Sequence, residues 1–347
     1  MSRPLSWPVL LATLLSGTSL TAEQASWAMR QVMTGEATPA QMAGFVTALR
    51  TKGETEQEVS ALADVMLELA QPLLLPPGLR AVDTCGTGGA GASTVNISTM
   101  AACVVAGAGA QVVKHGGRSA SSSSGSADVL EELGVVIELP PAGAARALAT
   151  GAPVFCFAPV FHPSMRHAAP VRRELGVPTV FNILGPLTNP ARPAAQVVGV
   201  ANERLAPVMA AVFARRGVDA LVVHGDDGLD ELTVATTSRV WWARGGAVSE
   251  HVVDPSRHGL TAGDLTGGDA AHNAAVCRRF LAGEAGPVRD AVLLNAAAAL
   301  VAYAPGSDTL DEQLGRQLAA AAASVDSGAA AEALQRWVSS SRAASEA

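Results

Sequence analysis

Residues 81–106 read AVDTCGTGGAGASTVNISTMAACVVA. This stretch, together with the segments before and after it, indicates the fold class. The β-branched run Ala81 to Cys85 predicts a strand that enters a glycine-rich turn. The alanine-rich stretch after it predicts a helix from Thr99 to Ala106. Strands that alternate with helices in this way are typical of a largely parallel α/β sheet. Such sheets bind ligands at the carboxyl ends of their strands, where these glycines lie.

The alternation continues through the chain. Further β-branched runs predict strands over residues 111–114, 154–157, 196–200 and 221–224. Helices are predicted over residues 127–133, 142–149, 203–216, 270–282, 288–302 and 310–325. Residues 6–69 have helical periodicity throughout, with capping boxes at Thr21–Gln24 and Thr38–Gln41. We therefore predict an α/β fold with a small all-helical domain and a mostly parallel central sheet flanked by helices.

Length and composition agree with a folded protein of two domains. The chain has 347 residues, and a domain averages roughly 150 residues. Hydrophobic residues make up 49% and charged residues 16% of the chain, which excludes a disordered protein. The net charge is −7 and no long Lys/Arg run occurs, which disfavours a nucleic-acid-binding surface.

Cysteine usage and hydropathy indicate a cytoplasmic protein that does not enter a membrane. The four cysteines form neither a Cys-x-x-Cys pair nor a dense disulfide framework, so a reducing setting fits best. Residues 4–15 are apolar, but Pro8 interrupts them and no small-x-small cleavage site follows, so we predict an amphipathic helix there. No uninterrupted apolar run reaches the roughly 18 residues that a membrane span needs.

Gly86, Gly88 and Gly91 fit the G-x-G-x-x-G spacing of dinucleotide-binding folds. Two features argue against that interpretation. The acidic residue expected about 20 positions later is missing, because that region reads Gln111-Val-Val-Lys-His115, and the third glycine opens no helix. A phosphate site explains the loop better, since a helix start offers free N–H groups to anions. A bare turn without a ligand is the alternative.

Polar and cationic side chains follow the glycine loop. Asn96, Ser98 and Thr99 lie at the start of the next helix, where an amide and hydroxyls add hydrogen-bond donors. Three residues with cationic or ionisable side chains follow the second strand: Lys114, His115 and Arg118. Because parallel strands end at one sheet edge, these residues favour a polyanion site there over ordinary surface charge.

Four carboxylates follow the strand predicted at residues 221–224: Asp226, Asp227, Asp230 and Glu231. Mg²⁺ prefers carboxylates together with waters and substrate phosphates. An Asp/Gly turn on the surface is the alternative. Together with the glycine loop, the cluster predicts a Mg²⁺-assisted site for a phosphorylated substrate.

The order of several motifs is more specific than any one of them. After GTGG and NIST come VVKHGGR (residues 112–118), a serine-rich loop, FAPVFHPSMRHAAPVRRELGVPTVFNILGPLTNPA (157–191) and VVHGDDGLDEL (222–232). In this order the chain closely resembles the anthranilate phosphoribosyltransferases of tryptophan biosynthesis, the actinobacterial type most of all. The resemblance extends over nearly the whole chain.

The resemblance implies a fold shared with pyrimidine nucleoside phosphorylases. It implies a helical domain of residues 1–75 plus roughly 164–190, packed against an α/β domain of residues 76–163 and 191–347. It also implies a homodimer formed through the helical domain. The expected reaction is the Mg²⁺-dependent transfer of the 5-phosphoribosyl group from 5-phosphoribosyl pyrophosphate (PRPP) to the amine of anthranilate, with release of pyrophosphate.

The resemblance also implies roles for individual residues. Those expected to bind PRPP are Gly86, Thr87, Gly88, Gly89, Thr94, Asn96, Ser98, Thr99 and Lys114. Those expected along the acceptor's route are Gly86, His115, Gly117, Pro159, His162 and Arg172. Ser98, Asp230 and Glu231 are expected to bind Mg²⁺. Lys114 would stabilise the departing pyrophosphate and Arg172 would meet the acceptor's carboxylate, so these two are the expected catalytic residues.

Two positions depart from the family pattern. Ala90 stands where the family has Asp in GTGGDG, and Gly117 stands where it has Asn in KHGNR. The first change removes a negative charge near the expected metal and could alter the Mg²⁺ dependence. The second removes an amide that helps to hold the acceptor, at a cost of roughly 0.5 to 1.5 kcal/mol.

These departures leave four alternatives open. The chain could be a paralogue of specialised metabolism that takes another aromatic or aminobenzoate acceptor. It could be a nucleoside phosphorylase, although the retained PRPP loop and the pair Asp230–Glu231 argue against this. It could bind nucleic acid or a regulatory ligand without catalysis, or be an inactivated enzyme.

Overall fold

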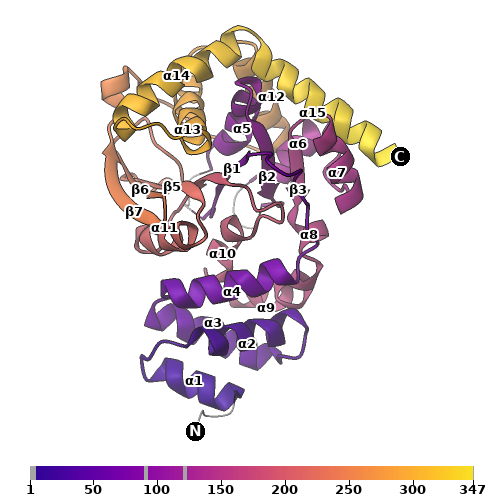
Figure 1. The fold of residues 1–347 in the computed structure, drawn as a ribbon, viewed down its shortest axis with the longest axis vertical. Helices are drawn as coiled ribbons and strands as arrows, with labels where there is room; N and C mark the ends of the chain where they lie inside the picture. Colours follow the sequence, from indigo (N-terminus) through magenta and orange to yellow (C-terminus); the bar gives the residue numbers. More distant parts are fainter. Residues whose placement is uncertain (1–4, 90–92, 120–122, 347) are drawn as a thin grey trace.

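The computed structural model describes residues 5–89, 93–119 and 123–346. A sheet with helices on both faces forms one end of the molecule, and a bundle of short helices that contains the N-terminus forms the other (Figure 1). The predicted fold class, a small helical part joined to a mostly parallel sheet, is confirmed.

The sheet has seven strands in the order β3-β2-β1-β4-β5-β6-β7. The five parallel strands are β1 (Ala81–Gly86), β2 (Gln111–Gly116), β3 (Val154–Phe157), β4 (Ala195–Gly199) and β5 (Asp219–Gly225). Each begins and ends within two residues of its predicted bounds. Strands β6 (Ser238–Arg244) and β7 (Ala247–Val253) add an antiparallel edge that was not predicted. Their tight connection through Gly245 and Gly246, both in the left-handed region, makes this hairpin.

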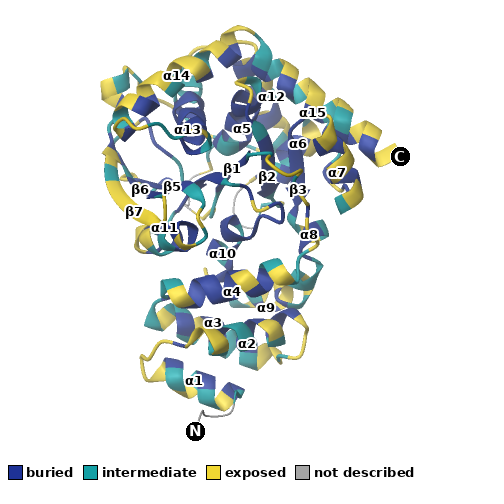
Figure 2. Ribbon diagram, viewed as in Figure 1, coloured by how far each residue is buried: buried dark blue, intermediate teal, exposed yellow. Residues whose placement is uncertain are grey.

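Helices cover both faces of the sheet. The most buried is α13 (Pro287–Tyr303), whose residues from Ala291 to Ala302 are all buried because it contacts β1, β4, β5 and α5 at once. On the opposite face α11 (Ala206–Arg215) packs against β5 and β6. The other helices around the sheet are α5 (Ile97–Gly107), α6 (Ser126–Glu132), α7 (Pro141–Ala149), α12 (Ala270–Leu281), α14 (Leu310–Asp326) and α15 (Ala329–Glu346). Figure 2 shows that α5 and α13 are buried, whereas the edge strand β7 is exposed and α14 and α15 expose their outer faces.

The helical part is built from α1 (Trp7–Leu15), α2 (Ala22–Met33), α3 (Pro39–Lys52) and α4 (Glu56–Glu68). The capping boxes predicted at Thr21 and Thr38 are present, and Thr55 forms a third one with Glu58. Buried apolar residues of these helices are continuous with those of α11 and of one sheet face. The two parts therefore share one hydrophobic core.

A segment between β3 and β4 runs out to the helical part and returns. Its elements are α8 (Ala158–Phe161), α9 (Ala169–Leu175), α10 (Phe181–Leu184) and the 3₁₀ turns Pro163–His167 and Pro186–Thr188. Helix α9 contacts α3, and α10 contacts α4. The domain boundaries at residues 75, 163 and 190 stay a prediction. Two further 3₁₀ turns, Glu203–Leu205 and Pro255–His258, complete the described elements, and the first of these replaces the beginning of the helix predicted from residue 203.

Within the described residues, no helix is both long enough and apolar enough to cross a membrane.

Candidate active site

A glycine turn at the end of β1 forms the floor of the candidate site. Gly88 and Gly89 have φ of 65° and 85°, the left-handed region that favours glycine. Thr87 fixes the turn to β4: its N–H donates to the Gly199 carbonyl (2.8 Å), and its Oγ1 accepts from the Ala201 N–H (3.1 Å). Ala90 lies outside the described residues.

The acidic pair Asp230–Glu231 lies directly against this turn. The Gly88 N–H donates to Asp230 Oδ2 at 2.7 Å. Glycines make this approach possible, because a Cβ on Gly199 would lie 1.6 Å from the Asp230 carbonyl and a Cβ on Gly86 2.8 Å from Asp230 Oδ2. Sequence reasoning did not single out Gly199. Its signal would have been a glycine at the end of a predicted strand.

The predicted cluster of four carboxylates is wrong in its extent. Asp226 accepts from the Thr237 hydroxyl, and Asp227 accepts from Thr233 Oγ1 (2.7 Å) and the Leu229 N–H (3.1 Å). Both therefore stabilise the turn before the acidic pair, as Asp residues in turns commonly do. Of the four, Asp230 accepts a hydrogen bond from the glycine turn and Glu231 accepts one from the Ser98 N–H. The described chain contains no group of three or more His, Cys, Asp or Glu side chains arranged around one point.

The acidic pair and the start of α5 suit a divalent cation. Burial raises the pKa of Asp230, and burial together with the Asp230 charge raises the pKa of Glu231 to about 8. Two half-buried carboxylates side by side are stabilised by a cation between them. The Ser98 N–H donates to Glu231, so the Ser98 hydroxyl lies on the same turn of helix as that contact.

Lys114 is the cation of the site. Its side chain is 1% exposed, and its Nζ donates to the Thr84 carbonyl and to Ser98 Oγ (3.3 Å). The ammonium therefore lies between β1 and the start of α5. A buried ammonium at the carboxyl edge of a sheet is suited to bind an anion.

The polar residues around the start of α5 differ in their hydrogen-bond partners and in their burial. Asn96 donates to the Ser124 carbonyl (3.2 Å) and accepts from Asn273 Nδ2 (2.8 Å), so it ties two loops to the helix start. Thr99 is fully buried inside α5. Thr94 forms a β-bridge with Thr266. Sequence reasoning missed Asn273, which is 177 residues away from its partner.

The prediction of three cationic residues at one edge is wrong for two of them. Arg118 donates to Asp128 (2.8 Å) and Glu131 (2.9 Å) on α6, which satisfies its charge. Burial and the neighbouring His162 lower the pKa of His115 to about 3, so its imidazole is neutral. Of the three, Lys114 alone brings a positive charge to the sheet edge.

His115 and His162 form a buried pair with ring centroids 5.1 Å apart. His115 Nδ1 lies 3.1 Å from the Gly185 carbonyl, and His162 Nε2 lies 2.9 Å from the Thr188 carbonyl. A carbonyl can only accept, so these two nitrogens carry the protons. The other two, His115 Nε2 and His162 Nδ1, are then unprotonated acceptors, and within the described chain neither has a partner.

Arg172 on α9 has a free guanidinium. It lies over the Phe181 ring, with Cζ 5.5 Å from the centroid, and burial lowers its pKa. No carboxylate of residues 5–89, 93–119 or 123–346 pairs with it, in contrast to Arg215 and Arg216 at the end of α11, which pair with acidic residues of α4. A half-buried guanidinium without an acidic partner is suited to bind a carboxylate.

Gly117 and Pro159 border an open space. A Cβ on Gly117 would meet only the Ala158 methyl, at 3.9 Å. Pro159 is exposed at the beginning of α8. A Cβ at position 117 would therefore displace no neighbour in the described part of the chain.

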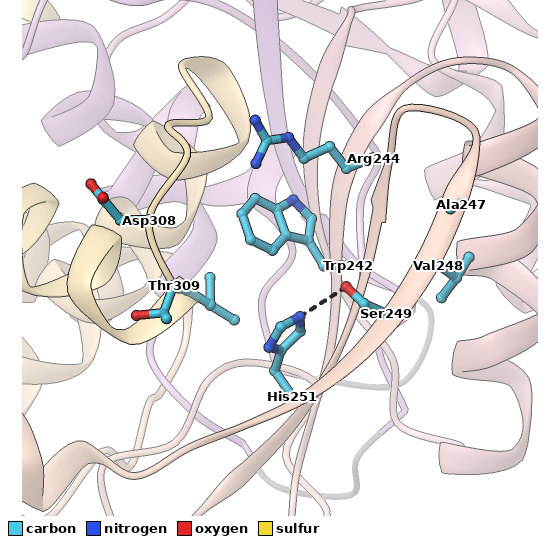
Figure 3. Close-up of a pocket in the computed structure, with 9 residues that line it drawn as sticks. Trp242, Arg244, Ala247, Val248, Ser249, His251, Asp308 and Thr309 are labelled. Atoms are coloured by element: carbon cyan, nitrogen blue, oxygen red, sulfur yellow. Dashed lines mark hydrogen bonds between the residues drawn. The ribbon is translucent and has the colours of Figure 1, made fainter.

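A cavity of about 270 Å³ at the other edge of the sheet is not this site (Figure 3). It lies by β6 and β7, three and four strands from β1. Arg244 stacks on Trp242 and donates to the Gly306 carbonyl (2.7 Å), and Asp308 pairs with Arg316 (2.6 Å). Its charged groups already have partners, so it offers none to a phosphate.

Comparisons with known proteins place this geometry in one family. Residues 8–70 match the helical bundle domain of the glycosyl transferase family, and residues 78–331 match its a/b domain. The anthranilate phosphoribosyltransferase of Nocardioides sp. is 59% identical over 96% of this chain and 98% of its own. The one from Saccharopolyspora erythraea is 58% identical over 96% and 95%. The chain belongs to the anthranilate phosphoribosyltransferase family. It is therefore a transferase.

Solved structures agree with that family. The anthranilate phosphoribosyltransferase of Thermus thermophilus superposes with a TM-score of 0.88 at 42% identity, over 96% of this chain and 99% of the other. The Saccharomyces cerevisiae enzyme in complex with PRPP and Mg superposes with a TM-score of 0.87 at 26% identity, over 97% and 98%. The sequence resemblance to anthranilate phosphoribosyltransferases is thus confirmed.

The two buried histidines predict how stability depends on pH. A histidine whose folded pKa is depressed stabilises the fold above its unfolded pKa of about 6.5, and this contribution is lost as the pH falls below that value. For His115, with a folded pKa of about 3, and His162, with about 4, the loss between pH 7 and pH 5 is about 2 kcal/mol each. His115→Asn and His162→Gln keep the N–H donor but cannot become charged.

Chemical denaturation at both pH values should therefore show a smaller loss of unfolding free energy in each variant than in the wild type. The exposed His272→Gln is the matched control and should lose as much as the wild type. An unchanged loss in both buried variants would contradict the neutral assignment.

Proposed function

We propose that this protein transfers the 5-phosphoribosyl group of PRPP to the amine of anthranilate and releases pyrophosphate, in a Mg²⁺-dependent step of tryptophan biosynthesis. The observation that carries the proposal is the hydrogen bond from the glycine turn to Asp230, with Glu231 beside it at the start of α5 and Lys114 at the same sheet edge. A loop of N–H donors, a cation site and an ammonium together suit a pyrophosphate. Family membership supports the same reaction.

On the PRPP side, the glycine turn and the start of α5 would hold the phosphates. The residues that we assign to this task are Gly86, Thr87, Gly88, Gly89, Thr94, Asn96, Ser98, Thr99 and Lys114. Their contributions differ. The backbone of the glycine turn and the Lys114 ammonium would bind directly, whereas Asn96 and the buried Thr99 would hold the loop in place.

Ser98, Asp230 and Glu231 would hold Mg²⁺, as their oxygen ligands suit this ion. When bound, Mg²⁺ would neutralise the charge that develops on pyrophosphate as it leaves. The Saccharomyces cerevisiae relative binds PRPP with Mg.

On the acceptor side, Arg172 would bind the carboxylate of anthranilate. Gly86, His115, Gly117, Pro159 and His162 would line the acceptor's route. The unprotonated nitrogens His115 Nε2 and His162 Nδ1 can accept hydrogen bonds from the N–H groups of a neutral arylamine.

The chemistry needs positioning more than acid–base power. The bond from ribose C1 to the pyrophosphate oxygen breaks, which leaves positive charge on the sugar and negative charge on the leaving group. The arylamine is neutral near pH 7, so its lone pair can attack C1 without prior deprotonation. The nitrogen then loses one proton, to water or to the departing pyrophosphate. Lys114 stabilises the leaving group, and Arg172 holds the amine in line with C1.

We also propose that the protein works as a homodimer through its helical part and acts in the cytoplasm. The four cysteines are buried and unpaired, which supports a reducing setting.

The first test measures pyrophosphate release by purified protein with PRPP and Mg²⁺, together with the loss of anthranilate fluorescence. We expect turnover with anthranilate, and its abolition by a chelator. A parallel panel of para-aminobenzoate, salicylate and substituted anthranilates separates the alternatives. Turnover of another acceptor alone would support the paralogue, and silence with every acceptor would contradict the proposal.

Arg172→Ala should lower kcat/KM for anthranilate by at least about 30-fold, because a charge-assisted hydrogen bond to a carboxylate is worth about 2 kcal/mol or more. The affinity for PRPP should stay within about twofold of the wild type. Arg173→Ala removes an exposed guanidinium one residue away and is the matched control. Equal losses in the two variants would rule out a specific role for Arg172.

The room for a Cβ at Gly117 motivates a second candidate, a paralogue that takes another aromatic or aminobenzoate acceptor. Gly117→Asn should lower KM for anthranilate by about 2- to 10-fold, since one hydrogen bond contributes about 0.5 to 1.5 kcal/mol. The same variant should lower the rate with substituted anthranilates, because the amide fills the space that they would use. Steady-state kinetics on both acceptor types checks this, and a change of the same size in both would argue that Gly117 does not set selectivity.

A further inference from the structure

Strands β1 and β2 share a main-chain register only at Ala81–Gln111 and Val82–Val112. From Val113 onwards β2 pairs with β3, and from Val82 onwards β1 pairs with β4. Lys114 and His115 lie in the half of β2 that no longer pairs with the backbone of β1. Side chains, not the sheet ladder, must therefore connect the two strands there.

The carboxylate of Asp83 makes the main connection. Asp83 is fully buried, and its Oδ1 accepts the His115 N–H at 3.2 Å. Its Oδ2 accepts Asn189 Nδ2 at 2.8 Å. The same Nδ2 donates to the Val113 carbonyl at 2.8 Å, and the Ala191 N–H donates to Asn189 Oδ1 at 2.9 Å. Asn189 thus occupies the opening between the strands.

Asn189 ends the segment that returns from the helical part. That segment supplies the Gly185 carbonyl to His115 and the Thr188 carbonyl to His162. It also contains α10, whose Phe181 stacks on Arg172. The acceptor-side groups therefore take their positions from a segment that Asn189 attaches to the sheet.

We propose that Asp83 is a positioning residue for the acceptor side of the site: its buried carboxylate fastens the returning segment to β2 through Asn189 and so places His115, His162 and Arg172. This inference rests on the proposed function for what it positions. Asp83 is not a catalytic residue, because it touches neither the glycine turn nor the acidic pair.

The chemistry requires a carboxylate. Asp83 accepts from two donors on different chain segments, one with each oxygen. An asparagine has one acceptor and one NH₂ group, so one of the two donors would face another donor. The mismatch is buried and cannot be relieved by water.

The test compares Asp83→Asn with Asn189→Ala and with the double variant. We expect Asp83→Asn to raise KM for anthranilate at least about 10-fold more than it changes the dissociation constant for PRPP. The double variant should raise KM for anthranilate no further than Asn189→Ala alone does, because both changes break the same connection. Hydrogen exchange should speed up at residues 113–116 and 185–189 in all three.

Glu58→Gln is the matched control. Glu58 is equally buried, in the helical part, and its carboxylate accepts from the Leu20 N–H (2.8 Å) and the Thr55 N–H (2.9 Å). It should lower stability without raising KM for anthranilate. If Asp83→Asn fails to fold, Asn189→Ala carries the same expectation for KM and hydrogen exchange.

Additive effects in the double variant, or losses of PRPP and anthranilate binding by equal factors, would overturn the inference. If the wild type does not turn over anthranilate, the proposed function fails. Hydrogen exchange still tests the connection in that case, because unchanged exchange at residues 113–116 and 185–189 would overturn it independently.

Discussion

The main chains of β1 and β2 pair for only two residues, and the site depends on what replaces that ladder. Asp83 bonds to the His115 N–H, Asn189 to the Val113 carbonyl, and Lys114 to the Thr84 carbonyl. Each connection holds a strand in place and orients a functional group at once. A buried polar network of this kind is stable only when each of its donors and acceptors has a hydrogen-bond partner. This requirement restricts the relative positions of the two strands.

A second constraint is the close approach of two distant backbones at the glycine turn. Gly86 and Gly199 end neighbouring strands, and the absence of a Cβ on each lets the chain at Asp230 pass against them. Asp230 is thereby brought within hydrogen-bond distance of Gly88, 142 residues away in sequence. The glycines at these strand ends therefore allow the backbone at Asp230 to pack closely, in addition to any contact with a ligand.

Charge is distributed unevenly across the site. Arg118, Asp226 and Asp227 have partners that belong to the scaffold. Lys114, Glu231 and Arg172 remain. Lys114 is buried and the other two are half-buried, so water screens their electrostatic interactions only in part. The histidine pair between them is neutral because burial disfavours the charged imidazole. The site therefore separates an anion-binding side, at the glycine turn, from an uncharged route lined by imidazoles.

The sequence by itself determined the elements and the family. Short β-branched runs placed the five parallel strands to within two residues, because the residue types that favour a strand are a local property of the sequence. Motif order identified the family. The partners of side chains and strands, by contrast, lie far apart in sequence. Only the tertiary structure showed that Asp226 stabilises a turn and that Arg118 forms ion pairs. It also showed that β6 and β7 form an antiparallel edge. It also decided the role of Asp83, a lone acid in an apolar strand, because its partner Asn189 lies 106 residues away.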